Sequence, residues 1–144
     1  MEQISRNLKT VAVILRTSQS IQELIKKDAA THGLNPTEFV VLELLYNNGD
    51  QPIQVIGKKV LISSGSITYV VDKLEQKKLV IRKECPEDRR VTYAAITDHG
   101  KVLMNQIFPH YEMKIDEIFE QLAHEDIDKV IELLKRVGNK IVKL

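Results

Sequence analysis

Residues 63–100 decide the predicted fold, and they read SSGSITYVVDKLEQKKLVIRKECPEDRRVTYAAITDHG. In residues 63–74 the apolar side chains recur at helical spacing. Two segments rich in β-branched residues follow, Leu79–Cys85 and Val91–Thr97, and the charged turn 86–90 separates them. The stretch therefore predicts a helix followed by a two-stranded hairpin with a basic tip.

The predicted helix has an apolar and a polar face. Ser63 is its expected N-cap, and the apolar face carries Ile67, Val70 or Val71, and Leu74. The polar face offers short hydroxyls, a phenol and a cation, which can hydrogen-bond base edges and phosphates in a major groove. Its residues are Ser64, Ser66, Thr68, Tyr69 and Lys73. A solvated helix face has the same composition, so this face alone does not distinguish DNA binding from simple exposure.

A second short helix precedes this one. Residues 53–60 follow Pro52 and place Ile53, Ile56 and Val60 on one face. Only a tight turn separates them from Ser63. Two short helices joined in this way have helix-turn-helix geometry.

Two further helices are predicted upstream. The first runs from Glu2 to about His32 and has an apolar face. The next starts at Asn35, which can cap free backbone N–H groups, and ends near Asn48. Pro36 fits its first turn, because a missing backbone donor costs nothing there.

Two more helices are predicted downstream. The first begins at Asp98, a good N-cap, and extends to about Leu122 with a kink at Pro109. The second begins at about Glu125. The predicted fold class is mainly α with a small β-hairpin wing, a winged helix-turn-helix flanked by terminal helices.

The chain has 144 residues, the length of one domain. A first helix of about 30 residues would be roughly 45 Å long, more than such a domain can easily cover. We therefore expect residues 1–34 and 101–144 to be dimerisation helices covered by another subunit. Residues 35–100 are expected to form the winged helix-turn-helix lobe.

Composition narrows the class of protein. With 43% hydrophobic and 28% charged residues, the chain is neither disordered nor of low complexity. Residues 51–100 carry a net charge of +3, so a polyanionic partner would bind there. The chain lacks a signal-peptide pattern and a bilayer-spanning stretch, so we expect a cytoplasmic protein. The four histidines lack metal-ligand spacing and no catalytic motif is present, so we expect no metal site, no cofactor and no enzyme.

The charged residues of the hairpin favour DNA binding. Arg89 and Arg90 lie at its tip and Lys83 lies on its shoulder, where cations can reach a narrow minor groove. Asp88 can pair with one of the two arginines and fix its orientation. Exposure alone would explain an isolated charged turn, but a basic hairpin directly after a helix-turn-helix favours DNA.

These residues resemble a family signature. Residues 88–100, DRRVTYAAITDHG, resemble the D-x-R-x(5)-L-T-x-x-G wing signature of the MarR family of winged helix-turn-helix regulators, with Ile96 in place of leucine. The run LISSGSITYVVDKLEQKKLVIR is similar to that family's recognition helix and first wing strand. The resemblance extends over essentially the whole chain.

The resemblance implies a homodimer with interlocking terminal helices that acts as a ligand- or stress-responsive repressor of transcription. It implies that Arg90 acts on the minor groove or its phosphates, with Asp88 as its support. It places Ser64, Ser66, Thr68 and Tyr69 on the major-groove face. Two recognition helices related by a dyad require a pseudo-palindromic DNA duplex with half-sites roughly 10 bp apart.

Within the family, the segment GLNPTEFVVLELLYNNGDQPIQVIGKK is similar to the MhqR-type repressors, which respond to quinones, hydroquinones and related electrophiles. The resemblance implies a pocket for a small aromatic or phenolic effector between the dimer helices and the DNA-binding lobe. Aromatic residues at helical spacing are also typical of a core. The candidate pocket residues are Arg16, Phe39, Tyr46, Phe108 and Tyr111.

Cys85 is the single thiol of the chain. Arg82, Lys83 and Arg89 are near it in sequence and could make it a target for electrophiles. An inert strand cysteine is the alternative. Several redox-sensing relatives carry a reactive cysteine near the N-terminus, and none is present here.

A competing hypothesis from another functional class is a protein-interaction module that keeps the winged fold without specific DNA binding. The Asp88 and Arg90 pair and the hydroxyl-rich helix face argue against it, because a docking surface requires neither.

Overall fold

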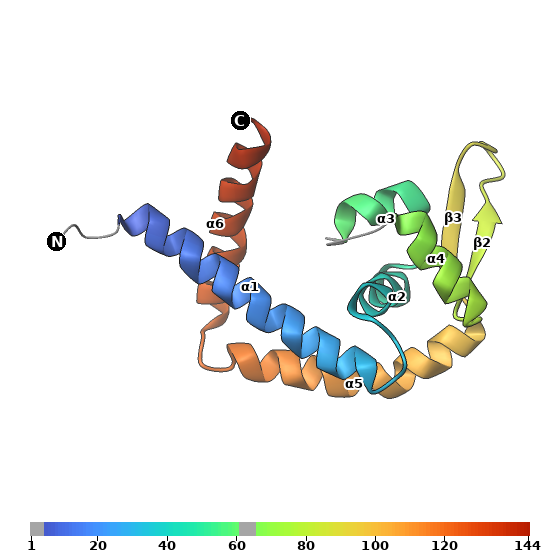
Figure 1. Ribbon diagram of the computed structural model, residues 1–144, viewed down its shortest axis with the longest axis horizontal. Coiled ribbons are helices and arrows are strands. Elements are labelled where there is room, and N and C mark those ends of the chain that lie inside the picture. The colour runs from blue at the N-terminus through green and yellow to red at the C-terminus, as the bar shows by residue number, and fades with distance from the viewer. Residues whose placement is uncertain (1–4, 61–65) are drawn as a thin grey trace. The chain divides into compact units, whose positions relative to one another are not determined.

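A computed structural model of the chain describes residues 5–60 and 66–144. It confirms the predicted class, because helices dominate and a small antiparallel sheet forms the wing (Figure 1). The helices are α1 (Arg6–Ala30), α2 (Pro36–Asn48), α3 (Ile53–Lys59), α4 (Ile67–Gln76), α5 (Asp98–Phe119) and α6 (His124–Val142). The strands are β1 (Gln51–Pro52), β2 (Val80–Glu84) and β3 (Thr92–Ile96).

The chain divides into two compact units. The first, Met1–Gln106, contains the elements from α1 to the beginning of α5. The second, Ile107–Leu144, contains the rest of α5 and α6. Helix α1 contacts α2 and therefore belongs to the same unit as the helix-turn-helix and the wing.

Local capping explains the bounds of α1 and α2. The Ser5 Oγ accepts a hydrogen bond from the Leu8 N–H at 3.1 Å, so α1 begins after Ser5, and the predicted start at Glu2 lies outside the described residues. Asn35 Oδ1 accepts from the Glu38 N–H at 2.8 Å, and Glu38 Oε1 accepts from the Asn35 N–H at 2.9 Å. This reciprocal capping box confirms the predicted start of α2.

Helix α4 begins later than the sequence predicts. Its N-cap is Ser66, whose backbone is extended and whose Oγ accepts a hydrogen bond from the Thr68 N–H at 3.1 Å. The expected cap, Ser63, lies outside the described residues, and the helix that it was expected to cap starts at Ile67. The predicted inward face is confirmed, with both valines, Val70 and Val71, buried together with Leu74.

The predicted two-stranded hairpin is confirmed as β2 and β3, and the short strand β1 extends it to a three-stranded sheet, which was not predicted. The strand order is β1-β3-β2, and all neighbours are antiparallel. In the added pair, Gln51 lies opposite Ala94 and Pro52 opposite Tyr93. A strand of two residues shows no alternating pattern, so the sequence gives no sign of it.

The junction between β3 and α5 explains the last part of the wing signature. Thr97 Oγ1 accepts a hydrogen bond from the Gly100 N–H at 3.0 Å and donates one to the Lys78 carbonyl at 2.8 Å. Thr97 therefore caps α5, and the predicted cap, Asp98, is the first helical residue. A Cβ on Gly100 would lie 2.4 Å from the Leu79 carbonyl oxygen, so this close approach requires glycine.

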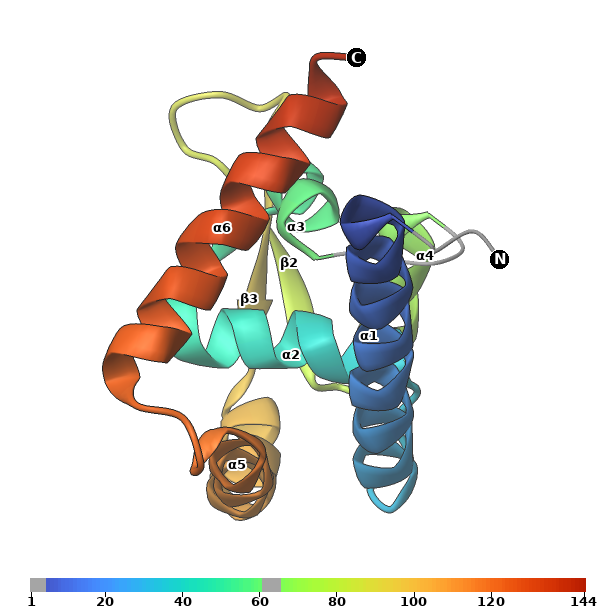
Figure 2. The same cartoon turned by 90° about the vertical axis from the view of Figure 1, so that its left-hand side faces the viewer.

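The core of the first unit lies between α2, α3, α4 and the sheet. Helix α1 lies beside one end of α2 (Figure 2). The largest fully buried side chains of these elements are Phe39, Val41, Leu42, Leu45, Ile56, Val71, Leu74 and Val80. This packing holds α4 and the wing together in one compact unit.

Two helices keep an apolar stripe exposed. No residue of α6 is buried, and Val130, Leu134, Val137 and Ile141 recur every three or four positions with 43–62% exposure. In α1, the side chains of Leu8, Val11 and Leu15 are 52–65% exposed. Apolar stripes of this length on single helices are typical of surfaces that another protein chain covers.

The C-terminal helices lie close to the predicted bounds, and the predicted kink at Pro109 stays a prediction. Helix α5 continues through Pro109 to Phe119. Helix α6 has Glu125 and Asp126 in its first turn, and the Asp126 carboxylate accepts a hydrogen bond from the Ala123 N–H at 3.2 Å. Within the described ranges, no helix is long and apolar enough to cross a membrane.

Glu43 of α2 supports a prediction about pH and stability. Burial raises the pKa of its carboxyl above the ordinary value of 4.5. The folded state therefore holds this proton more tightly than the unfolded state, and the resulting stability is lost as pH rises through the raised pKa. We expect Glu43→Gln to increase the free energy of unfolding at about pH 7 and to have less effect at about pH 4, as measured by urea unfolding. Equal effects at both pH values would contradict the prediction.

Candidate nucleic-acid interface

The outward face of α4 brings three of the predicted contact residues together. Thr68 and Tyr69 are exposed, Tyr69 to 57%. Lys73 lies one turn further along, with its Nζ 5.3 Å from the centroid of the Tyr69 ring. This cation–π contact holds the phenol and the ammonium side by side. The face therefore offers a hydroxyl, a phenol and a cation on one surface.

The three predicted serines differ from this group. Ser63 and Ser64 lie outside the described residues. Ser66 is exposed, but its hydroxyl oxygen caps α4, so it stands at the helix end and not on the helix face. Its hydroxyl hydrogen remains available to an acceptor, because the cap uses only the oxygen lone pair.

The tip of the wing holds Arg90 in a defined orientation. Its Nε and Nη2 donate to the two carboxylate oxygens of Asp88 at 3.1 and 3.3 Å, and its backbone N–H donates to Asp88 Oδ1 at 3.0 Å. The side-chain and backbone hydrogen bonds from Arg90 lower the pKa of Asp88. The Arg90 side chain is nevertheless 90% exposed. Asp88 therefore orients a guanidinium that stays open to solvent, as the sequence predicts for one of the two arginines.

The other predicted cations of the wing are arranged differently. Arg89 is exposed beside Arg90. Lys83 of β2 lies 3.7 Å from the Asp50 carboxylate, and both side chains are about half exposed. An exposed pair of this kind contributes little stability, so Lys83 can exchange Asp50 for another anion.

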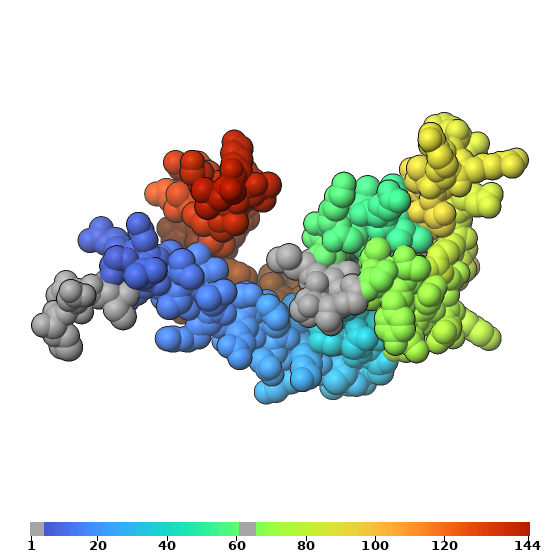
Figure 3. All heavy atoms as spheres, turned by 45° about the horizontal axis from the view of Figure 1, so that its top comes forward, coloured from blue at the N-terminus to red at the C-terminus, as the bar shows by residue number. Residues whose placement is uncertain are grey.

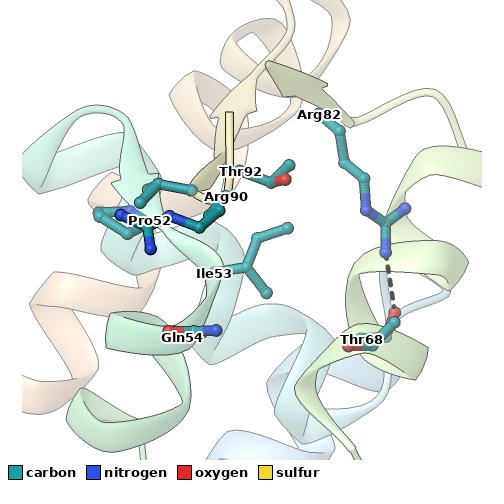
Figure 4. Close-up of a pocket in the computed structure, with 8 residues that line it drawn as sticks. Pro52, Ile53, Gln54, Thr68, Arg82, Arg90 and Thr92 are labelled. Carbon is teal, nitrogen blue, oxygen red and sulfur yellow. Dashed lines mark hydrogen bonds between the residues drawn. The ribbon is translucent and has the colours of Figure 1, made fainter. Parts of the chain in front are cut away.

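A groove of about 250 Å³ lies at the base of the wing. Figure 4 shows Arg90 on the side of Pro52, and Arg82 reaching from β2 toward Thr68 on α4. The loop between β2 and β3 extends beyond α3 and α4 (Figure 3). The groove is lined by Pro52, Ile53, Gln54, Thr68, Arg82, Arg90, Val91 and Thr92. It places the wing arginine and the outward helix on one continuous surface.

Arg82 also belongs to this surface, although it is not among the residues predicted from the sequence. Its guanidinium lies 2.7 Å from Asp72 Oδ1, also contacts the Glu75 carboxylate, and donates to the Thr68 carbonyl at 3.2 Å. Arg82 is two residues after the buried Val80, and residues two apart in a strand lie on the same face. The two-residue spacing from Val80 would have predicted that Arg82 lies on the face of β2 that packs against α4.

The candidate effector residues are distributed over both units. In the first, Arg16 is exposed on α1, Phe39 is fully buried in the core, and the Tyr46 hydroxyl contacts Asn105 Oδ1 at 2.5 Å. In the second, the ring centroids of Phe108 and Tyr111 are 6.4 Å apart. These placements leave the effector pocket a prediction.

Cys85 is half-buried at the end of β2, where its N–H donates to the Val91 carbonyl at 3.0 Å. This bond closes the base of the wing loop. Its role as a sensor remains a prediction. In the described part of the chain, no group of three His, Cys, Asp or Glu side chains could hold a metal ion.

The outward face of α4 supports a prediction about sequence reading. We expect Thr68→Ala to reduce DNA affinity mainly at particular base pairs, because a hydroxyl reads base edges. We expect Lys73→Ala to weaken binding to all duplexes alike and to reduce the salt dependence, because an ammonium binds phosphates as a point charge. Fluorescence-anisotropy titrations against a panel of duplexes with single base-pair changes measure both effects. Uniform losses in both variants would show that α4 does not read bases.

Comparisons with known proteins agree with this geometry. The sequence profile of the MarR family matches residues 34–92. The chain is 56% identical over 133 residues to the HTH-type transcriptional regulator MhqR of Bacillus subtilis (strain 168), and the match covers 92% of each protein.

Solved structures share the fold. AbsC, a MarR family transcriptional regulator from Streptomyces coelicolor, matches with a TM-score of 0.83 at 20% identity and full coverage of both chains. NadR in complex with 4-hydroxyphenylacetate matches with a TM-score of 0.81 at 20% identity, covering 95% of this chain and 97% of NadR. The identity to MhqR places the chain among transcription regulators and not among enzymes. The chain belongs to the MarR family of winged helix-turn-helix transcriptional regulators.

Proposed function

We propose that this regulator is a homodimeric cytoplasmic repressor of a pseudo-palindromic DNA site, from which a small phenolic or quinone-like compound or electrophile stress releases it. In this proposal α4 enters the major groove with Thr68, Tyr69 and Lys73. The wing carries Arg90 to the adjacent minor groove or its phosphates.

The observation that carries the proposal is the oriented, exposed guanidinium of Arg90. Asp88 binds it through both carboxylate oxygens, while 90% of the Arg90 side chain remains exposed. A surface ion pair contributes little stability by itself. A bidentate pair does restrict orientation, which lowers the entropy lost when the arginine binds DNA.

The apolar stripes of α1 and α6 support dimerisation. Regulators of the MarR family bind DNA and act as dimers. We propose that residues 1–34 and 101–144 form the subunit interface and that residues 35–100 form the DNA-binding lobe. Burial of the exposed Leu8, Val11, Leu134 and Val137 side chains would then stabilise the pair by the hydrophobic effect.

A phenolic effector is supported by the relatives. MhqR resembles this chain over most of its length, and NadR binds a phenolic acid on the same fold. Arg16, Phe39, Tyr46, Phe108 and Tyr111 remain the candidate effector residues. Such a compound can release DNA only if it binds the released geometry more tightly than the DNA-bound geometry.

The test is a fluorescence-anisotropy titration of DNA from upstream of the protein's own coding region. It uses two salt concentrations and is repeated with a hydroquinone, a quinone and 4-hydroxyphenylacetate. We expect tight binding that weakens steeply with salt, because phosphate contacts release counterions. At least one of the compounds is expected to lower the affinity.

The outcomes separate the parts of the proposal. Specific binding without release by any compound would keep the repressor and reject this class of effector. Binding that is absent or insensitive to salt, also on DNA selected from a random pool, would favour the protein-interaction module. Cys85→Ser would abolish release by the quinone alone if the thiol senses electrophiles.

A further inference from the structure

We infer that Arg82 is a positioning residue for DNA recognition: it fixes α4 relative to the wing and so determines how well the two elements fit one DNA site. This inference rests on the proposed DNA contacts. Arg82 acts through α4 and does not itself need to touch DNA.

The contacts of Arg82 extend along two turns of α4. Its Nη2 lies 2.7 Å from Asp72 Oδ1 and donates to the Thr68 carbonyl at 3.2 Å, while its Nη1 binds Glu75 Oε1. The Arg82 backbone N–H also donates to Glu75 Oε2 at 3.3 Å. Residues 68, 72 and 75 are spaced by four and three positions, so they share one helix face. The Arg82 side chain therefore contacts two consecutive turns of α4 on one helix face.

The position of Arg82 in the sheet connects this face to the wing tip. Arg82 pairs with Ala94 of β3, the strand that begins two residues after Arg90. A change in the position of α4 against β2 would change the distance between Thr68 and Arg90. Both residues line the groove at the base of the wing, where a DNA backbone would meet them together.

The apolar packing of α4 does not supply this orientation by itself. Val70, Val71 and Leu74 bury one face of α4, and the hydrophobic effect has no preferred direction. Charge-assisted hydrogen bonds from a planar guanidinium are directional. The core therefore holds α4 to the lobe, and Arg82 determines its rotation and tilt.

The charges around Arg82 argue against a direct phosphate contact. The Arg82 side chain is only 27% exposed, and the carboxylates of Asp72 and Glu75 compensate its charge. By contrast, Arg90 is 90% exposed. A lysine at position 82 would keep the charge but could not reach acceptors on two turns, because an ammonium lacks the planar fork.

The experiment measures the affinity of Arg82→Lys for two duplexes. One is a duplex that wild type selects from a random-sequence pool, and the other is a scrambled duplex of equal length and composition. We expect the variant to lose roughly 5- to 30-fold in affinity for the selected duplex, the effect of weakening a charged hydrogen-bond network by one or two bonds. Its affinity for the scrambled duplex is expected to stay near wild type, because non-specific binding depends on net charge.

The ratio of the affinities for the selected and the scrambled duplex distinguishes a positioning role of Arg82 from a general loss of folded protein. A partly unfolded variant would lose affinity for both duplexes equally, so their ratio would not change. Circular dichroism melting checks the fold, and Arg136→Lys on α6, an exposed arginine paired with Glu132, is the matched control.

A second variant keeps the inference testable if Arg82→Lys folds poorly. Glu75→Gln removes a negative charge, which raises non-specific affinity, but it weakens the contact to Arg82 and should lower the preference for the selected duplex. Glu84→Gln, at the end of the same strand β2, removes the same charge outside this network and should leave the preference unchanged.

Two results would overturn the inference. One is an unchanged ratio in both Arg82→Lys and Glu75→Gln with intact folds. The other is additive losses in the Arg82→Lys, Glu75→Gln double variant, because residues that act through one contact are not additive. If wild type selects no duplex at all, the proposed DNA binding itself is wrong.

Discussion

Arg90→Ala should cost about 1 to 3 kcal/mol of binding free energy for the operator and leave fold and dimerisation intact. The side chain is 90% exposed and contacts Asp88 of its own loop, so its removal does not disturb the core. The loss arises because the wing would no longer place a guanidinium in the minor groove. Anisotropy titration against the selected duplex measures the affinity, and sedimentation measures the dimer.

Asp88→Asn is the companion to this variant. It keeps the shape of the side chain but removes the charge that orients Arg90, so we expect a smaller loss than for Arg90→Ala. Arg89→Ala is the comparison variant for orientation, because it removes a wing cation that Asp88 does not hold through the two side-chain bonds seen for Arg90, and we expect it to lose less affinity than Arg90→Ala. Unchanged operator affinity of a folded Arg90→Ala dimer would show that the wing assignment is wrong.

Leu134→Asp should convert the dimer into a monomer and reduce operator affinity by roughly a hundredfold or more. In the dimer, binding of one subunit to its half-site raises the effective concentration of the second subunit at the other half-site, and a monomer loses this gain. Leu134 lies in the stripe of α6 with Val130, Val137 and Ile141, and no residue of this helix is buried within the chain. A carboxylate in the centre of an apolar interface would be desolvated without a partner. Analytical ultracentrifugation and anisotropy titration check the two effects.

Asn139→Asp provides the matched control for Leu134→Asp. It introduces the same charge on the opposite side of α6, outside the apolar stripe. We expect the control to remain a dimer with wild-type affinity. If the Leu134→Asp protein also remains a dimer and binds the operator normally, α6 is not part of the dimer interface.

Local signals in the sequence predicted much of the fold. Asn35, Pro36 and Glu38 encode the start of α2, because a capping box joins residues three positions apart. Asp88 and Arg90 likewise form their pair within one turn, so the sequence indicated the oriented arginine of the wing. The family resemblance also followed from a short segment, residues 88–100.

The errors of the sequence analysis concern contacts between distant residues or competing caps. Strand β1 has two residues and becomes a strand only because β3, some forty residues later, supplies its hydrogen-bond partners. Ser66 caps α4 and Thr97 caps α5, although Ser63 and Asp98 are equally suitable by residue type. The choice at Thr97 depends on the Lys78 carbonyl, to which its hydroxyl donates.

Local signals account for the order of the helices, the basic wing, the apolar face of the first helix and the family. These features depend on residues a few positions apart, whose spacing is independent of the rest of the chain. The third strand and the contacts of Arg82 with Asp72, Glu75 and the Thr68 carbonyl depend instead on tertiary packing. These contacts form only once α4 and β2 have packed against each other, so no spacing along the chain encodes them.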